Sequence, residues 1–406
     1  MRYRSIILAS LVLISWVGFL GLMGWWQDQQ VVYPLGRHYL LESHVLGETT
    51  YQASNSAQAQ IKDGIVYGFL PYWNVDDYQL DDSLTHVAYF RLALQANGSL
   101  ANDVGLSMYQ SERFTHIVEQ IERQNLKFDL TIFTSHSDDI YAFVTCEQCQ
   151  ERLIAQLDDI ITQDHVDGIN LDLEYLGTLT QDEQQKMTYF LYHLKNMLQE
   201  KHPRTKLSID VYGGAANMDS NLWDFSKIGQ IVDRVIIMGY DYKTTGADTP
   251  GSSSPTLGAN LWNGGIWENV LAMKRYVSSD KIILAIPFYG YAWETTTCEL
   301  ATAKTHPDTG QTLTYRGAQN ILADNAYRAV EHWDENSLTP YIVFHDPEVE
   351  EGSADDRCHI GFFENERSLT YKINLIENLN LGGIAIWALG FEGDYPELWQ
   401  TINSRF

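Results

Sequence analysis

Short apolar segments alternate with amphipathic segments from Ile65 to the end of the chain. This alternation is typical of parallel strands that are joined by crossover helices. Apolar residues at helical spacing mark 147–163, 181–200 and 267–277 as helices. The segments that read as strands are 66–70, 84–90, 127–133, 168–173, 206–211, 235–240, 282–288 and 383–388. Eight such units predict an α/β fold, a (β/α)8 TIM barrel with its active site at the carboxyl ends of the strands.

The strand count alone also fits a doubly wound open sheet. Such sheets commonly bind nucleotides through a glycine-rich turn. The sequence has no Gly-x-Gly-x-x-Gly after the first predicted strand and no Gly-Lys-Ser/Thr loop. The barrel is therefore preferred, and 406 residues with 45% hydrophobic content suffice to build it.

The fourth predicted strand carries acidic and amide side chains at every second position of 166–175. Asn170, Asp172 and Glu174 share one face because successive side chains of a strand point to opposite faces. A half-exposed strand would alternate in the same way, but its polar face usually includes Thr, Ser, Lys or Arg. Asp172 and Glu174 lie roughly 6 to 7 Å apart along the backbone, so burial and mutual repulsion should raise the pKa of one of them. A catalytic carboxylate pair is favoured.

The stretch 167–174 places polar residues at a characteristic spacing, namely Asp167, Asn170, Asp172 and Glu174. This spacing resembles the Asp-x-x-Asp-x-Asp-x-Glu signature of glycoside hydrolase family 18, the chitinase family, with Asn in place of the middle Asp. Three later stretches, 238–241, 285–293 and 382–390, resemble the family in the expected order. The form with Asn170 is similar to the branch that includes bacterial spore-cortex and cell-wall N-acetylglucosaminidases. The resemblance covers the chain from about Ile65 to its end.

The resemblance implies retaining, substrate-assisted cleavage of β-1,4 linkages at N-acetylglucosamine, in chitin-type oligosaccharides or peptidoglycan glycan. It implies that Glu174 is the general acid, that Asp172 accepts the acetamide N–H and that Tyr240 holds its carbonyl oxygen. Asn170 completes this catalytic set, and its uncharged amide should let Asp172 ionise more readily. The implied substrate-binding residues are Trp387, Asp241, Met238, Phe69 and Trp73, with Tyr289 and Trp293 as further candidates.

A long segment separates the last two predicted strands. About 65 residues lie between Trp293 and Cys358, more than a barrel crossover requires. The segment contains a helix-like stretch, 317–332, and a strand-like stretch, 341–345. We therefore predict a small α+β insertion at about 294–358, and a plain long loop is the alternative.

Four cysteines suit an oxidising compartment without requiring one. Cys298 and Cys358 flank the predicted insertion, and a disulfide between them would close its neck. Cys146 and Cys149 form a lone Cys-x-x-Cys. Because no second pair accompanies it, a local disulfide or two free thiols are favoured over a zinc site.

The first residues of the chain predict export. Arg2 and Arg4 precede an uncharged run, 6–26, that is long enough to span a bilayer and lacks an Ala-x-Ala cleavage site. We predict an uncleaved signal anchor at 1–26, with a cleaved signal peptide as the alternative. A polar linker at 27–63 and the catalytic barrel at 64–406 follow. The membrane would be contacted only through the N-terminal segment.

The predicted partner is an N-acetylglucosamine-containing glycan. A net charge of −26 argues against nucleic acid, which would be repelled, whereas a neutral glycan is indifferent to it. No metal or organic cofactor is implied, and the oligomeric state stays open. One rival is a catalytically inactive, chitinase-like lectin, although such proteins usually lose the acid that Glu174 supplies here. The other is an unrelated metal-dependent barrel enzyme, but the 12 histidines do not cluster at predicted strand ends.

Overall fold

The computed structural model describes residues 64–406 except 77, 219–220, 259–263 and 354. The predicted signal anchor and linker lie outside the described residues. Within the described part of the chain, none of the helices combines the length and the apolar character that crossing a membrane would require.

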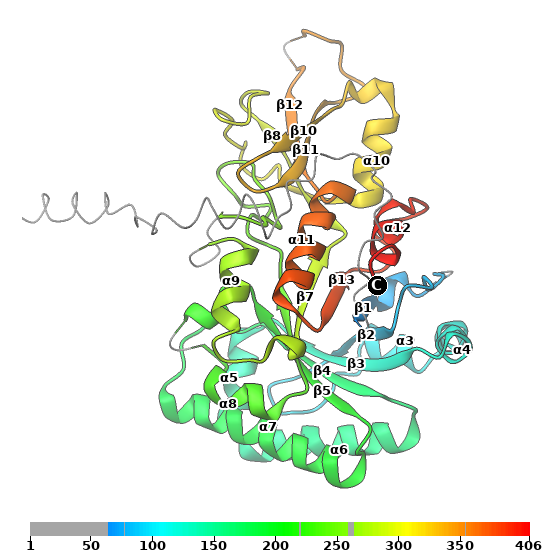
Figure 1. Ribbon diagram of the computed structural model, residues 1–406, viewed down its shortest axis with the longest axis vertical. Helices are drawn as coiled ribbons and strands as arrows, with labels where there is room; N and C mark the ends of the chain where they lie inside the picture. The colour runs from blue at the N-terminus through cyan, green and yellow to red at the C-terminus, as the bar shows by residue number, and fades with distance from the viewer. Residues whose placement is uncertain (1–63, 77, 219–220, 259–263, 354) are drawn as a thin grey trace, which may run out of the picture. The chain divides into compact units, whose positions relative to one another are not determined.

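Eight parallel strands close into a barrel in the order β1-β13-β7-β6-β5-β4-β3-β2. Each pair of neighbours is joined in parallel register, so the predicted (β/α)8 fold is confirmed (Figure 1). The strands are β1 (Ile65–Pro71), β2 (His86–Ala93), β3 (Lys127–Thr134), β4 (Gly168–Leu173), β5 (Lys206–Tyr212), β6 (Arg234–Met238), β7 (Ile282–Pro287) and β13 (Gly383–Trp387).

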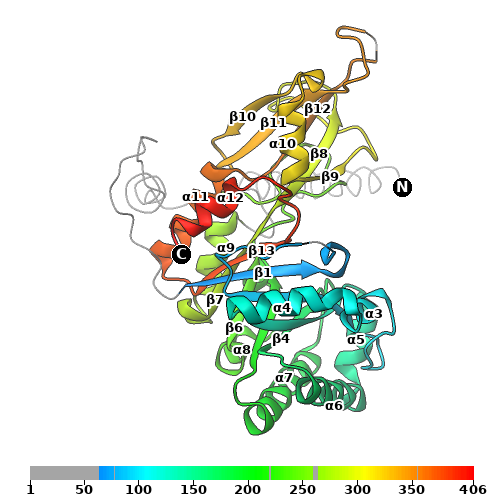
Figure 2. The ribbon, with the colours of Figure 1, turned by 90° about the vertical axis from the view of Figure 1, so that its right-hand side faces the viewer.

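Amphipathic helices cover the outside of the barrel, as Figure 2 shows for α4, α6 and α7. In α6 the buried residues Leu153, Leu157 and Ile161 recur every four positions, which turns one face towards the strands. Thr180 and Glu183 form a capping box at the start of α7. The helices are α3 (Val104–Tyr109), α4 (Thr115–Gln124), α5 (Ser137–Thr145), α6 (Glu147–Gln163), α7 (Gln181–Lys201), α8 (Phe225–Ile231), α9 (Ile266–Met273), α11 (Glu366–Leu379) and α12 (Glu397–Asn403).

Side chains fill the barrel interior at its amino-terminal end. The Tyr67 hydroxyl donates to Asp129 Oδ2 at 3.0 Å, and Arg234 lies 3.6 Å from the same oxygen. The Tyr67 ring stacks on His86, with 5.7 Å between the ring centroids. An apolar cluster that includes Phe69 and residues of β2, β6, β7 and β13 packs against Tyr67. The interior is thus a packed core, and space for a substrate lies at the carboxyl ends of the strands.

A five-stranded antiparallel sheet of order β10-β11-β12-β8-β9 is inserted between β7 and β13. Figures 1 and 2 both show it beyond the carboxyl end of β7, with α10 packed beside it. It begins earlier and ends later than the predicted 294–358. Its elements are β8 (Tyr289–Thr295), β9 (Gln311–Thr314), α10 (Tyr315–Ala323), β10 (Val330–Asp334), β11 (Thr339–His345) and β12 (Cys358–Phe362).

The predicted helix 317–332 is wrong beyond Ala323. The Asp324 side chain accepts a hydrogen bond from the backbone N–H of Ala326 and starts a 3-10 turn instead of another helical turn. Arg328 then adopts a left-handed conformation, with φ 50°. The chain reverses there and continues as β10, which pairs with β11.

Both cysteine pairs are disulfides. Cys298 and Cys358 are joined across 60 residues, as predicted, and tie the loop after β8 to the first residue of β12. Cys146 and Cys149 form a local bridge at the start of α6. The first bridge therefore closes most of the insertion into a covalent loop.

An ion pair lies fully inside the protein where the chain leaves the insertion. Lys372 Nζ lies 2.7 and 2.8 Å from the two Glu364 oxygens, and the two residues are 0% and 2% exposed. We expect Lys372→Met to lower the free energy of unfolding by about 3–5 kcal/mol, because Glu364 is then buried without its cation. Urea denaturation measures this change. The double variant, Lys372→Met with Glu364→Gln, should recover most of the lost stability. Wild-type stability of Lys372→Met alone would contradict the expectation.

Candidate active site

Strand β4 carries the predicted acidic row to the carboxyl end of the barrel. Asn170 and Asp172 are 0% and 5% exposed, and Glu174 follows directly after the strand. The Glu174 backbone N–H donates to Thr134 O at 3.0 Å, which continues the pairing with β3. Asp167 lies elsewhere, before the strand begins, where its carboxylate accepts the Phe128 N–H at 3.1 Å. Three of the four signature positions therefore meet at one site, and Asp167 has a structural role.

Strand β5 places a second polar row beside the first. Asn170 Nδ2 donates to Ser208 Oγ at 3.1 Å and to Asp210 Oδ1 at 2.8 Å. Because the register pairs Asn170 with Ser208, Asp172 lies level with Asp210 and Glu174 with Tyr212. None of the three β5 residues Ser208, Asp210 and Tyr212 was predicted as a site residue.

Glu174 is poised to donate a proton. Burial raises the pKa of its carboxyl group to about 7; the nearby Asp241 charge adds to the rise, and a hydrogen bond from Tyr212 opposes it. Burial also raises the pKa of Asp172 well above its usual value, with further contributions from Asp210 and Glu174. At neutral pH a substantial fraction of Glu174 is therefore protonated, as a general acid requires.

Tyr240 and Asp241 lie just beyond the end of β6. Burial and the surrounding carboxylates raise the pKa of Tyr240 well above its usual value, so its hydroxyl stays neutral and can donate a hydrogen bond. Asp241 has a left-handed backbone, φ 61°, which aspartate tolerates better than most residues. Its Oδ1 accepts hydrogen bonds from Tyr289 and from Tyr291, the latter at 2.9 Å. Both tyrosines belong to β8, so the insertion itself positions this acid.

Aromatic side chains form the other side of the site. Trp387, the last residue of β13, is partly exposed and packs in the same apolar clusters as Tyr240. The rings of Phe90 and Phe69 support it, with centroids 4.5 and 5.8 Å from the Trp387 ring. Phe69 is only 2% exposed and Met238 only 6%. We therefore revise their predicted role from contacting the substrate to supporting the residues that do.

Trp73 is the exposed aromatic residue next to the site. Half of its surface is accessible, and its ring packs edge-on against Phe90 at 6.1 Å. It also lines a cavity of about 480 Å³ between the ends of β1 and β13, with Tyr78, Arg316 and Asp394 among the other lining residues. Neither Asp172 nor Glu174 lines this cavity. Trp73 lies between the cavity and Phe90, which in turn contacts Trp387.

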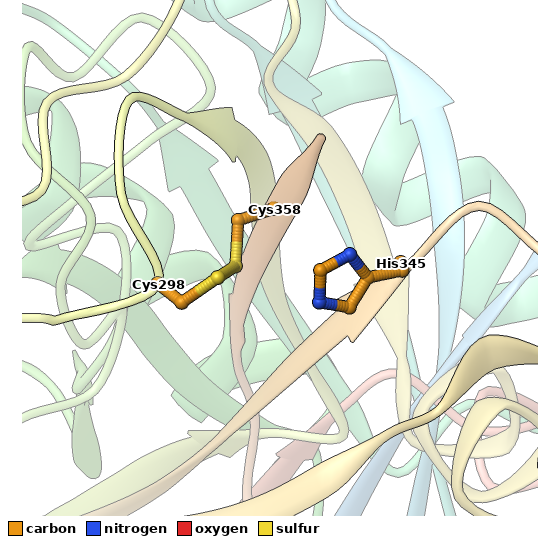
Figure 3. Close-up of side chains that lie close together, drawn as sticks. All are labelled: Cys298, His345 and Cys358. Carbon is orange, nitrogen blue, oxygen red and sulfur yellow. A yellow bond between two sulfur atoms is a disulfide. The ribbon is translucent and has the colours of Figure 1, made fainter. Parts of the chain in front are cut away.

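One cluster among the described residues has the composition of a metal site. Ligand atoms of Cys298, His345 and Cys358 lie within 4.8 Å of one another (Figure 3). The two sulfurs are bonded to each other, so neither is the thiolate that a metal ion would require. His345 Nδ1 lies 2.8 Å from Asp356. The cluster belongs to the inserted sheet, and the reactive groups at the barrel strands are carboxyls, phenols and amides.

Comparisons with known proteins identify the family. Residues 49–392 match the family described as Glycosyl hydrolases family 18. Human di-N-acetylchitobiase is 23% identical over 62% of this chain and 67% of its own length. The cortical fragment-lytic enzyme of Bacillus subtilis (strain 168) is 22% identical over 80% of this chain and 68% of its own.

Solved structures show the same fold. A family 18 chitinase of Cycas revoluta, solved with allosamidin and also with (GlcNAc)3, has a TM-score of 0.70 at 18% identity and covers 84% of this chain and 99% of its own. The spore cortex-lytic enzyme SleL of Bacillus megaterium QM B1551 has a TM-score of 0.66 at 19% identity, and the match covers 87% of this chain and 75% of the SleL chain. The family match spans most of the chain, including Asn170, Asp172, Glu174 and Tyr240, and so this protein is a glycosidase that belongs to glycosyl hydrolases family 18.

Proposed function

We propose that the protein hydrolyses β-1,4 linkages at N-acetylglucosamine in chitin-type oligosaccharides or peptidoglycan glycan, with retention and with assistance from the substrate. The observation that carries the proposal is the grouping of Glu174, Asp172 and Tyr240. A carboxyl group with a pKa of about 7 lies beside a buried carboxyl group and a neutral phenol. The ligands solved with the Cycas revoluta chitinase, (GlcNAc)3 among them, support this class of glycan.

In the first step Glu174 protonates the glycosidic oxygen as the bond to the anomeric carbon breaks. The carbonyl oxygen of the sugar's own 2-acetamido group attacks that carbon, so no enzyme nucleophile is needed. Asp172 accepts the amide N–H, which becomes more acidic as the ring closes. The Tyr240 hydroxyl donates to the carbonyl oxygen and holds it in line for attack.

In the second step the ionised Glu174 removes a proton from a water molecule, which attacks the anomeric carbon of the oxazolinium intermediate. The carbon–oxygen bond to the acetamido group breaks, and the product keeps the configuration of the substrate. The Trp387 ring stacks on the apolar face of the same sugar. Asp241, fixed by two tyrosines of β8, can bind sugar hydroxyl or amide groups nearby.

Product analysis tests the proposal. The piece from about residue 60 to 406 is incubated with chitooligosaccharides and, separately, with purified peptidoglycan, and new reducing ends are measured. Hydrolysis of either substrate supports the proposal and identifies the substrate. If neither is cut but oligosaccharide still binds, the protein acts as a lectin instead.

The pH dependence of kcat/KM should follow the ionisation of the Glu174 carboxyl group. Because the acid must be protonated, activity should fall as the pH rises through about 7. Tyr212→Phe removes the hydrogen bond that favours the carboxylate form, so the falling limb should move to higher pH. A falling limb that moves to lower pH, or does not move, would contradict this account of the acid.

We also propose that the barrel acts outside the cytoplasm, tethered by an uncleaved N-terminal signal anchor. The uncharged run 6–26 and the two disulfides support this location, since disulfides persist in oxidising compartments. Fractionation of cells that produce the full chain, followed by protease treatment of intact cells, tests it. A cytoplasmic, protease-protected protein would rule it out.

A further inference from the structure

The middle position of the family signature lacks its usual carboxyl group in this chain, because Asn170 stands there. We propose that Asp210, on the neighbouring strand, supplies the missing group and acts as a positioning residue for Asp172. The inference rests on the proposed function, in which Asp172 orients the acetamido group of the substrate.

The register of β4 and β5 places the two carboxyl groups side by side. Asn170 pairs with Ser208, and Leu171 pairs with Ile209. One residue further on, Asp172 and Asp210 lie level on adjacent strands, whose backbones are roughly 4.8 Å apart. Both side chains face the barrel interior and are 5% and 4% exposed. Asp210 therefore lies beside Asp172 on the neighbouring strand, whereas an Asp at position 170 would lie two residues before it on the same strand.

Asn170 fits this arrangement because it can donate hydrogen bonds. Its amide nitrogen donates to Asp210 Oδ1 at 2.8 Å and to Ser208 Oγ at 3.1 Å, which fixes the Asp210 carboxyl group. An ionised Asp at 170 could donate neither bond and would repel an ionised Asp210. The Oδ1 atom of Asp172 is buried without a hydrogen-bond partner. No hydrogen bond therefore ties this oxygen to Asn170, and we infer that Asp172 can turn towards Glu174 and the substrate.

Asp210 faces acids and phenols from the two strands beside β5 and from β1 across the barrel. These groups are Asp172 and Glu174 of the β4 row, Tyr240 after β6, and Tyr67 of β1. Burial and the Glu174 charge raise the pKa of Asp210 to about 8, although the hydrogen bond from Asn170 lowers it. At neutral pH Asp210 is therefore mostly protonated, so the two neighbouring carboxyl groups need not both carry a charge when Asp172 ionises.

An exchange of the two side chains tests the inference. Asp210→Asn keeps a hydrogen-bond acceptor for Asn170 but removes the carboxyl group. We expect this variant to lower kcat by roughly 10- to 10²-fold with little change in KM. The pH optimum should move to lower pH, because Asp172 and Glu174 lose a neighbouring acid that raises their pKa values. Asn170→Asp alone should move the optimum higher. The double variant, Asn170→Asp with Asp210→Asn, should return both kcat and the optimum towards wild type.

A control variant and two further measurements separate this role from a structural one. Ser208→Ala removes the other partner of Asn170 without altering a carboxyl group, and its pH optimum should stay in place. Melting temperatures and oligosaccharide affinities are recorded for every variant, to separate altered chemistry from altered folding. An unchanged kcat and pH profile in Asp210→Asn, or a folded double variant that recovers nothing, would overturn the inference.

A titration that needs no turnover distinguishes failure of the inference from failure of the proposed function. The carbon-13 shift of the Asp172 carboxyl group, assigned with Asp172→Ala, is followed against pH in wild type and in Asp210→Asn. A lower pKa of Asp172 in Asp210→Asn supports the coupling, and an unchanged pKa overturns it. Inactive wild-type protein on both glycans would instead count against the proposed function.

Discussion

Glu174→Gln should lower kcat by about 10²–10⁴-fold, the usual contribution of a general acid, while chitooligosaccharides still bind. The amide keeps the volume of the side chain and can still accept the hydrogen bond from Tyr212, but it has no acidic proton to give to the leaving oxygen. Because the Glu174 carboxyl group is mostly buried, its pKa of about 7 suits a group that must be protonated at neutral pH.

The measurement is single-turnover hydrolysis, with affinity determined separately by calorimetry. Glu200→Gln makes the same chemical change on the exposed face of α7 and is the matched control, with wild-type rates expected. Substantial turnover by Glu174→Gln would remove Glu174 from the role of acid. Loss of both turnover and binding would point instead to a disturbed site.

Asp172→Ala should lower kcat by about 10²–10³-fold even though Glu174 is intact, a loss comparable to removing one group that stabilises developing charge. The acetamido nitrogen would lose its acceptor just as it becomes more acidic. Because Ala also leaves a small cavity at a buried position, Asp172→Asn provides a second variant that keeps the volume of the side chain.

A substrate without the acetyl group is the control for this prediction. Wild-type protein should not cut a fully deacetylated oligosaccharide, because the attacking carbonyl oxygen is absent. Unchanged kinetics in both Asp172 variants, or efficient cleavage of the deacetylated substrate by wild type, would rule out substrate assistance. The first outcome would also remove the reason for a positioning role of Asp210.

The barrel could be predicted from the sequence because each of its strands is a separate apolar segment between helical ones. The acidic row at Asn170, Asp172 and Glu174 was visible for a related reason, since three polar groups at alternate positions stand out in a buried strand. Ser208, Asp210 and Tyr212 show the same alternation. They were missed because serine and tyrosine are ordinary strand residues, and only the register with β4 shows what they contact.

Other features depended on tertiary contacts that no local pattern reveals. The β8 tyrosines lie in the stretch 285–293 that resembles the family, and nothing in their spacing shows that they bond Asp241. Phe69 shares the strand parity expected of a substrate contact, yet Trp387 covers it. In the insertion a local signal did exist, since Asp324 and Asn325 favour turns and end the amphipathic pattern of α10.

The connection between β7 and β8 bears on how this protein selects a glycan. Only Phe288 separates the two strands, so the wall that holds Asp241 is a direct continuation of the barrel. The return path through β12 is tied by Cys298–Cys358 and leads into the buried Glu364–Lys372 pair. We expect a wall that is anchored at both ends to move little when a glycan binds. Under the proposed function, discrimination between glycans would then depend on the shape of the site before the glycan binds, and we expect sugars with bulky branches to bind weakly.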